Sequence, residues 1–129
     1  MNKKLRVVHY INQFYAQYGG EDTAGMGIVA KAEAVGPGLL IDQYLGSAGE
    51  IVGTVICGDN FIAENLGPVT DQIVEEIKKF EPDLFIAGPG FNAGRYGLAC
   101  GSVTAAVRKK LRIPAVTGLF EENPGAELY

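Results

Sequence analysis

The sequence predicts an α/β fold, with an open, mostly parallel sheet of about four strands and helices on both faces. Short apolar runs rich in β-branched residues alternate with segments of helical spacing, which implies right-handed crossovers between parallel strands. The runs lack polar alternation, as is typical of strands buried on both faces. Because 47% of the 129 residues are hydrophobic, residues 1–129 are expected to form a single Rossmann-like or flavodoxin-like three-layer domain.

Four apolar runs predict the strands, and each is about as long as an ordinary strand. The connections between them are long enough to hold a helix, so neighbouring strands are expected to run parallel. The runs are Leu5–Tyr10, Ile51–Cys57, Leu84–Ala87 and Ala115–Leu119.

The clearest helix is predicted over Val69 to Phe80, where apolar residues recur at spacings of four, four and three and share one face. Pro68 suits its first turn, and Pro82 closes the segment. A second helix is predicted from Arg95 to Leu111, and it ends before Pro114.

A weaker helix is predicted over Pro37 to Leu45, and a glycine-rich segment precedes it. Six glycines fall between Gly19 and Gly38. Glycine allows tight turns and a close approach of the backbone to a ligand. The segment is therefore either a ligand-binding turn or simply a flexible loop.

Composition and charge exclude several classes of function. The formal net charge is −4, and scattered Lys and Arg provide no basic surface for nucleic acid. No apolar run approaches the ~20 residues that cross a bilayer, and the opening run is too short for a signal peptide. We therefore expect a cytoplasmic protein without nucleic-acid or membrane partners. One histidine and two distant cysteines do not make a zinc site of usual spacing, so no metal ligand is assigned.

Candidate binding residues follow the predicted strands. In open parallel sheets, ligands bind outside the carboxyl ends of the strands. Asp59 is alternatively a helix cap, and Glu121 and Glu122 are alternatively solvated loop charges. The candidate substrate-binding residues are Asn12, Asp59, Asn60, Asn92, Gly94, Arg95, Tyr96, Glu121 and Glu122.

The glycine-rich loop from Gly88 to Gly97 is the most informative of these segments because it leads directly into a helix. Free backbone N–H groups and the helix dipole attract an anion, and Arg95 adds a fork for a carboxylate or phosphate. The alternative is a tight turn in which Arg95 pairs with Glu121 or Glu122. The loop has neither the Walker A pattern nor GxGxxG, so nucleotide binding is weakly supported.

Cys57 is a candidate reactive thiol because it ends the second predicted strand. A nearby cation or helix N-terminus would lower its pKa, whereas burial would make it a small apolar side chain. Cys100 is interpreted as a helix-packing residue, and His9 as a hydrogen-bonded core residue. No catalytic residue is assigned.

Several strings, taken in order along nearly the whole chain, resemble the amino-terminal part of component B (selenoprotein B) of the glycine/sarcosine/betaine reductases. The end of the chain, Glu121 to Tyr129, reads like a connection to a further segment, so a fragment of a longer subunit is expected. The strings are Val8–Ala16, Gly19–Glu21, Val35–Gly38, Val55–Asn60, Phe85–Pro89, Phe91–Gly97, Val116–Gly118 and Glu121–Gly125.

The resemblance implies reductive cleavage of a C–N bond of glycine, sarcosine or betaine, giving acetyl phosphate and an amine. It implies a partner subunit with a pyruvoyl group, selenoprotein A as acceptor of the carboxymethyl group, and electrons from thioredoxin. A selenocysteine or cysteine motif is expected further along the full subunit. Neither Cys57 nor Cys100 takes that role, so no cofactor is expected in this chain and the fragment alone is expected to be inactive.

The resemblance also gives the candidate residues roles. The carboxylate would rest on Arg95 and the loop amides, while Asp59, Glu121 or Glu122 would face the nitrogen. For a methylated nitrogen, the aromatic wall would come from Tyr10, Tyr96 and Phe91. Two other hypotheses stay open: a binding or assembly module, including a homo-oligomer, and a flavodoxin-like binder of a small ligand.

Overall fold

The computed structural model describes residues 4–91 and 94–119 and confirms the α/β class. Its sheet has five strands in the order β2-β3-β1-β4-β5. β1 is parallel to β3 and β4, and β4 is parallel to β5. The four predicted strands are present as β1 (Leu5–Asn12), β3 (Gly49–Cys57), β4 (Leu84–Phe91) and β5 (Ala115–Leu119).

The predicted strand count was wrong by one. β2 (Val29–Lys31) pairs antiparallel with β3 at the edge of the sheet, inside the glycine-rich segment. Three partly exposed residues give no apolar run and no clear alternation, so the sequence pattern does not reveal this strand. A single-turn 3-10 helix, η1 (Glu21–Thr23), lies in the same segment.

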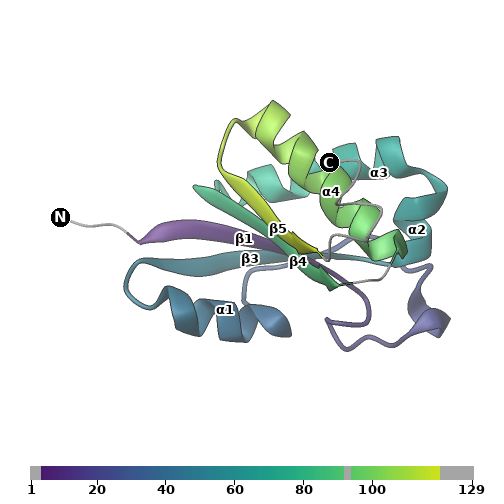
Figure 1. Cartoon of the computed structure of the whole chain (residues 1–129), viewed down its shortest axis with the longest axis horizontal. Coiled ribbons are helices and arrows are strands. Elements are labelled where there is room, and N and C mark those ends of the chain that lie inside the picture. Colours follow the sequence, from purple (N-terminus) through teal and green to yellow (C-terminus); the bar gives the residue numbers. More distant parts are fainter. Residues whose placement is uncertain (1–3, 92–93, 120–129) are drawn as a thin grey trace.

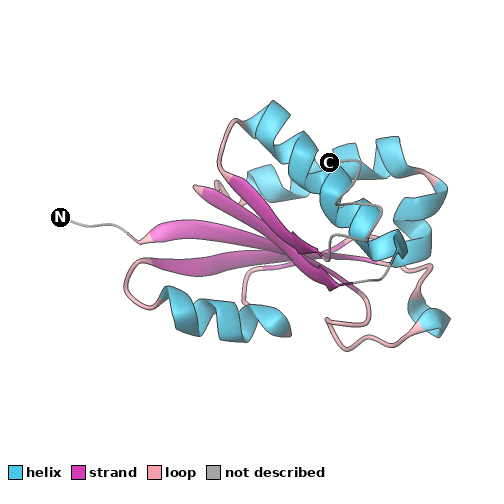
Figure 2. Ribbon diagram, viewed as in Figure 1, coloured by secondary structure: helices cyan, strands magenta, loops and turns pink. Residues whose placement is uncertain are grey.

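Helices lie on both faces of the sheet, as predicted (Figures 1 and 2). α1 (Pro37–Leu45) lies on one face, and α2 (Asp59–Glu64), α3 (Leu66–Lys79) and α4 (Gly94–Leu111) lie on the other. Among the described residues, no helix has the length and apolar character needed to cross a bilayer.

The main core lies between the sheet and helices α2 to α4. The predicted apolar face of α3 is buried there, with Val69, Ile73 and Ile77 against the sheet. Lys78 and Lys79 fall in the last turn of α3, where positive charge complements the helix dipole.

The parallel strands place their carboxyl ends at one edge of the sheet, at the right of Figure 1. β1 is the middle strand, and its residues from Val7 to Asn12 are all buried. Since α2 follows β3 after one residue and α4 begins close after β4, both helices start at that edge. The sheet therefore gathers the ends of several segments at one place.

His9 is a buried core residue in β1, as the sequence analysis expected. Its Nε2 lies 2.7 Å from the carbonyl oxygen of Gly88, which can only accept, so Nε2 carries the hydrogen. Within the described structure, Nδ1 has no hydrogen-bond partner. A Cβ on Gly38 of α1 would lie 2.9 Å from Nδ1, so glycine lets the helix approach the ring closely. Burial lowers the pKa of His9, and the Gly88 hydrogen bond opposes this only in part.

We expect the stability of the fold to decline as the pH falls below about 6.5. Below about pH 6.5 the histidine of the unfolded chain becomes protonated, whereas in the folded chain His9 stays neutral to a lower pH because its pKa is lowered. The unfolded state therefore binds more protons, and the free energy of unfolding falls by at most about 1.4 kcal/mol per pH unit. Urea unfolding followed by circular dichroism from pH 7.5 to 5.5 measures this slope. Since His9 is the single histidine in the sequence, a His9→Gln variant should show a flat profile; an equal slope would contradict the prediction.

Candidate functional site

A pocket of about 460 Å³ opens at the carboxyl edge of the sheet. Its lining comes from the end of β1 and the loop after it, from the start of α2 and from the start of α4. These segments are distant in sequence and meet here because their strands are neighbours in the sheet. The lining residues are Asn12, Gln13, Phe14, Tyr15, Gly20, Asp59, Gly94, Arg95 and Tyr96.

Buried polar side chains hold one wall of the pocket in place. Asn12 Nδ2 donates to Asp59 Oδ2 at 3.0 Å, and Asn12 Oδ1 accepts from the Tyr15 backbone N–H at 3.0 Å. Gln13 Oε1 accepts from the Asp59 N–H at 3.1 Å, and Gln13 Nε2 donates to the Gly20 carbonyl at 3.2 Å. With Asp59 only 7% exposed, this network fixes a carboxylate inside the pocket wall.

Asp59 is not the helix cap that its position had suggested as an alternative. Gly58 is the N-cap of α2 and makes no side-chain capping bond. The Asp59 carboxylate instead accepts from Asn12 across the end of the sheet.

Arg95 lies in the first turn of α4 and lines the pocket. Its Nη1 donates to Asn60 Oδ1, so α2 helps to orient the guanidinium. The N–H groups in this first turn lack partners within the helix, and the helix dipole makes the region favourable for negative charge. A guanidinium and a helix N-terminus thus share one wall of the pocket.

Aromatic rings form the remaining wall. The ring centroid of Tyr15 lies 5.6 Å from that of Tyr96 and 5.4 Å from that of Phe14. Tyr96 is buried, and burial raises its pKa well above the usual tyrosine value, so the ring is neutral. Tyr10 was expected in the aromatic wall, but it is fully buried behind Tyr96 and is not among the described lining residues.

The structure brings most of the predicted residues together. Five of them line the pocket, and Asn60 stands beside it as the partner of Arg95. Asn92, Glu121 and Glu122, together with the side chain of Phe91, lie outside the described residues. The five lining residues are Asn12, Asp59, Gly94, Arg95 and Tyr96.

The structure favours burial over reactivity for Cys57. The thiol is fully buried, and burial, with the nearby Asp59, raises its pKa from 9.0 to about 12. At neutral pH this thiol is therefore protonated, and the thiolate is the nucleophilic form. Of the two alternatives for Cys57, the structure thus favours the small buried side chain. Cys100 is also buried and free, with its pKa raised to about 12 by burial.

Four lining residues are absent from the predicted binding residues: Gln13, Phe14, Tyr15 and Gly20. The sequence identifies Gln13 only as a residue that follows the first predicted strand, and Phe14 and Tyr15 come directly after it, so the rule that ligands bind after strand ends applies to all three. A polar residue followed by two aromatic residues at a strand end is the signal that was available. Gly20 sits among many glycines, and nothing in the sequence distinguishes it from them. Among the described residues, no group of three or more His, Cys, Asp or Glu is placed to hold a metal ion.

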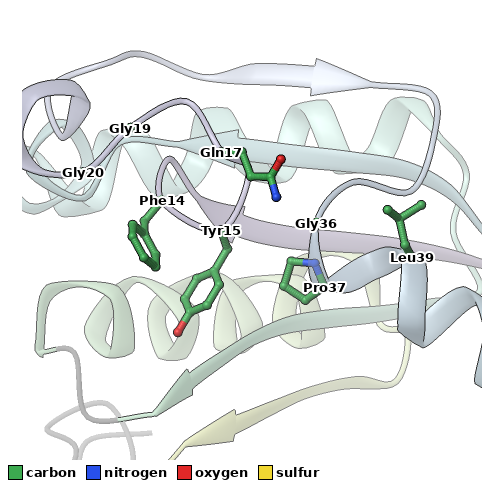
Figure 3. A pocket seen from close by; sticks show the side chains of 8 residues that line it. All are labelled: Phe14, Tyr15, Gln17, Gly19, Gly20, Gly36, Pro37 and Leu39. Atoms are coloured by element: carbon green, nitrogen blue, oxygen red, sulfur yellow. The ribbon is translucent and has the colours of Figure 1, made fainter.

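A second cavity of about 610 Å³ adjoins the pocket, since Phe14, Tyr15 and Gly20 line both. Figure 3 shows the rings of Phe14 and Tyr15 on one side of it and Pro37 and Leu39 on the other. None of its described lining residues carries a charge, so the two cavities differ in chemistry.

Comparison with known proteins confirms the resemblance seen in the sequence. The family model "Glycine/sarcosine/betaine reductase selenoprotein B" matches residues 4–129. The glycine reductase complex component B subunit gamma of Carboxydothermus hydrogenoformans is 54% identical over 126 residues, which cover 98% of this chain and 29% of the relative. The sarcosine reductase complex component B subunit beta of Peptoclostridium acidaminophilum is 52% identical over 127 residues, with the same two coverages.

A third relative, the betaine reductase complex component B subunit beta of Peptoclostridium acidaminophilum, is 38% identical over 124 residues, covering 96% of this chain and 28% of the relative. The chain thus spans less than a third of the length of these relatives. No solved structure matches it.

Proposed function

Because the chain belongs to the glycine/sarcosine/betaine reductase selenoprotein B family, we propose that it forms the substrate-binding part of a component B subunit. In this proposal, the complete system cleaves the C–N bond of glycine or an N-methylated glycine reductively and yields acetyl phosphate and an amine. The redox chemistry belongs to a selenocysteine or cysteine motif further along the full subunit, to a pyruvoyl-containing partner and to selenoprotein A. These 129 residues bind and orient the substrate.

One observation carries the proposal: Arg95 and Asp59 line the same pocket. Glycine, sarcosine and betaine each have a carboxylate next to a cationic nitrogen. A guanidinium at a helix N-terminus suits the carboxylate, and a buried carboxylate suits an ammonium that bears N–H groups. The two charges are held on different helices, α4 and α2, so their separation is set by the sheet.

A contact of Arg95 is compatible with this role. Arg95 Nη1 donates to Asn60 Oδ1, so α2 helps to orient the guanidinium at the pocket wall. The free thiols of Cys57 and Cys100 fit a reducing cytoplasm, where we place the protein.

We expect Arg95→Ala to weaken binding of glycine, sarcosine or betaine about 10- to 100-fold, because a hydrogen bond to a charged group contributes roughly 1.5–3 kcal/mol. Isothermal titration calorimetry on the chain with each of the three ligands measures this. Lys109→Ala is the matched control, since it removes one positive charge from the opposite end of α4. Circular dichroism of each variant verifies the fold. Absence of heat with all three ligands, or equal dissociation constants in the Arg95 variant, would contradict the proposal.

A specific observation also favours an assembly role for the face formed by α1. Leu39, Leu40 and Tyr44 of this helix are 63%, 55% and 84% exposed, although the opposite side of the helix packs on β3. Exposed apolar patches of this kind often mark contact surfaces. The three relatives are named as subunits of complexes, so a contact between copies or with another subunit is our second candidate.

If α1 mediates self-association, sedimentation velocity should show dimers that a Leu40→Ser/Tyr44→Ser double variant converts to monomers. Replacing two large exposed apolar residues removes most of the apolar area that the contact would bury. Gln43→Ser, on the same helix and also exposed, is the control and should leave the dimers intact. A wild-type chain that stays monomeric across the concentration range would count against self-association.

A further inference from the structure

Two aromatic side chains form a right-angled corner at the mouth of the pocket. The rings of Phe14 and Tyr15 meet at an interplanar angle of 80° with centroids 5.4 Å apart. Tyr96 continues the wall behind Tyr15 at 5.6 Å. Phe14 is 60% exposed, which is unusual for a phenylalanine beside a well-formed core. The corner thus presents ring surface to whatever occupies the pocket.

The corner stands between two cavities of different chemistry. On one side lies the pocket that Arg95 and Asp59 line. On the other lies the cavity next to Gly36, Pro37 and Leu39, whose described lining residues carry no charge (Figure 3). A small molecule whose carboxylate rests on Arg95 would therefore have apolar space beyond the rings.

We propose that the corner formed by Phe14 and Tyr15, with the second cavity behind it, receives the N-methyl groups of the substrate and sets the preference for their number. This inference rests on the proposed function. Glycine, sarcosine and betaine differ in the number of methyl groups on nitrogen, so a residue that discriminates among them must lie at the nitrogen. The site is thereby divided into a carboxylate end at Arg95 and an ammonium end at the rings.

The chemistry of the nitrogen supports this division. An ammonium with N–H groups can donate to Asp59, whereas a trimethylammonium cannot donate and spreads its charge over its methyl groups. The faces of aromatic rings attract such a cation within about 6 Å of the ring centroid. The Asp59 carboxylate therefore favours glycine, and the aromatic rings favour betaine. The relative strength of these two contacts determines which substrate binds more tightly.

Another ring of the same loop already holds a cation of the protein. Lys31 Nζ lies 5.3 Å from the centroid of the Tyr18 ring. Tyr18 is not among the described lining residues of either cavity, so it serves as an aromatic control outside the proposed site.

The experiment compares Phe14→Leu with the unchanged chain, titrating glycine, sarcosine, betaine and tetramethylammonium chloride. Leucine keeps the apolar volume and removes the ring. We expect Phe14→Leu to weaken betaine and tetramethylammonium about 3- to 30-fold and to change glycine less than twofold, because the cation–π contribution is lost. Tyr15→Leu should give the same pattern, and the control Tyr18→Leu should change no affinity.

The outcomes separate this inference from the proposed function. If Arg95→Ala weakens glycine binding as expected while Phe14→Leu leaves the ratio of betaine to glycine affinity unchanged, the proposed function stands and the aromatic corner is overturned. If none of the three amino acids binds, the proposed function fails. The titration with tetramethylammonium then tests the aromatic corner separately. Binding of that cation that depends on Phe14 supports it, and absence of such binding overturns it.

Discussion

Gly36→Ala is expected to destabilise the fold by about 3–5 kcal/mol and to abolish ligand binding. Gly36 is the N-cap of α1 and has φ 55° and ψ −126°, a conformation that residues with a Cβ rarely adopt. A Cβ there would also overlap the carbonyl oxygen of Tyr15, and the same glycine lines the second cavity. The substitution therefore strains the backbone and displaces the loop that carries Phe14 and Tyr15. Urea unfolding by circular dichroism measures the first effect, and betaine titration measures the second.

Gly46 provides a matched control at the other end of α1. It has nearly the same backbone conformation, φ 53° and ψ −124°, but a Cβ there would meet nothing within 4 Å. Gly46→Ala should therefore cost only the backbone strain, about 1–3 kcal/mol, and leave binding unchanged. Equal losses of stability in the two variants would mean that the overlap with the Tyr15 carbonyl oxygen does not add to the destabilisation by Gly36→Ala.

The fold was predictable because its main strands are buried. Strands such as β1 and β3 are nearly continuous apolar runs, and α3 repeats apolar residues at helical spacing, so each element is visible in the sequence. β2 was not predictable, since three edge residues pair only through backbone hydrogen bonds with β3 and need no apolar pattern. A tertiary contact creates that strand, and local sequence does not encode it.

The candidate site was predictable to the extent that it depends on topology. The rule for strand ends predicts that Asn12, Asp59 and Arg95 lie together because parallel strands share an edge, and all three line the pocket. It did not reveal that Asn12 binds Asp59, since the rule gives proximity and not orientation. Nor could it decide the state of Cys57, because exposure at a strand end depends on what packs over it. The aromatic corner lies in a loop without periodicity, where only position after β1 gives a signal.

Asn12→Asp is expected to destabilise the chain by about 3 kcal/mol at pH 7, because it places a second carboxylate against Asp59. The present contact is a 3.0 Å bond from the Asn12 amide to a carboxylate that is 7% exposed. Two carboxylates at that distance in a buried site do not readily ionise together. One would hold a proton, so the deficit should shrink as the pH falls from about 6 towards 4, where the unfolded chain also protonates this carboxyl group. Urea unfolding of both chains from pH 7.5 to 4.5 measures the difference in unfolding free energy.

A charge swap distinguishes repulsion from simple loss of the amide. The double variant Asn12→Asp/Asp59→Asn exchanges the two side chains and restores one amide beside one carboxylate. If like charge is the cause, the swap should recover most of the stability that Asn12→Asp loses, giving a coupling energy of about 2 kcal/mol in the double-mutant cycle. Asn12→Ala should show a smaller loss without the low-pH recovery, since it adds no charge. The opposite result is a swap variant no more stable than the summed effects of Asn12→Asp and Asp59→Asn on the unfolding free energy. That result would show that the orientation of Asn12, which its bond to the Tyr15 N–H maintains, matters more than the charge. Betaine binding by the swap variant then decides whether the carboxylate must stand on α2, because the swap moves the negative charge to β1 and leaves Arg95 in place.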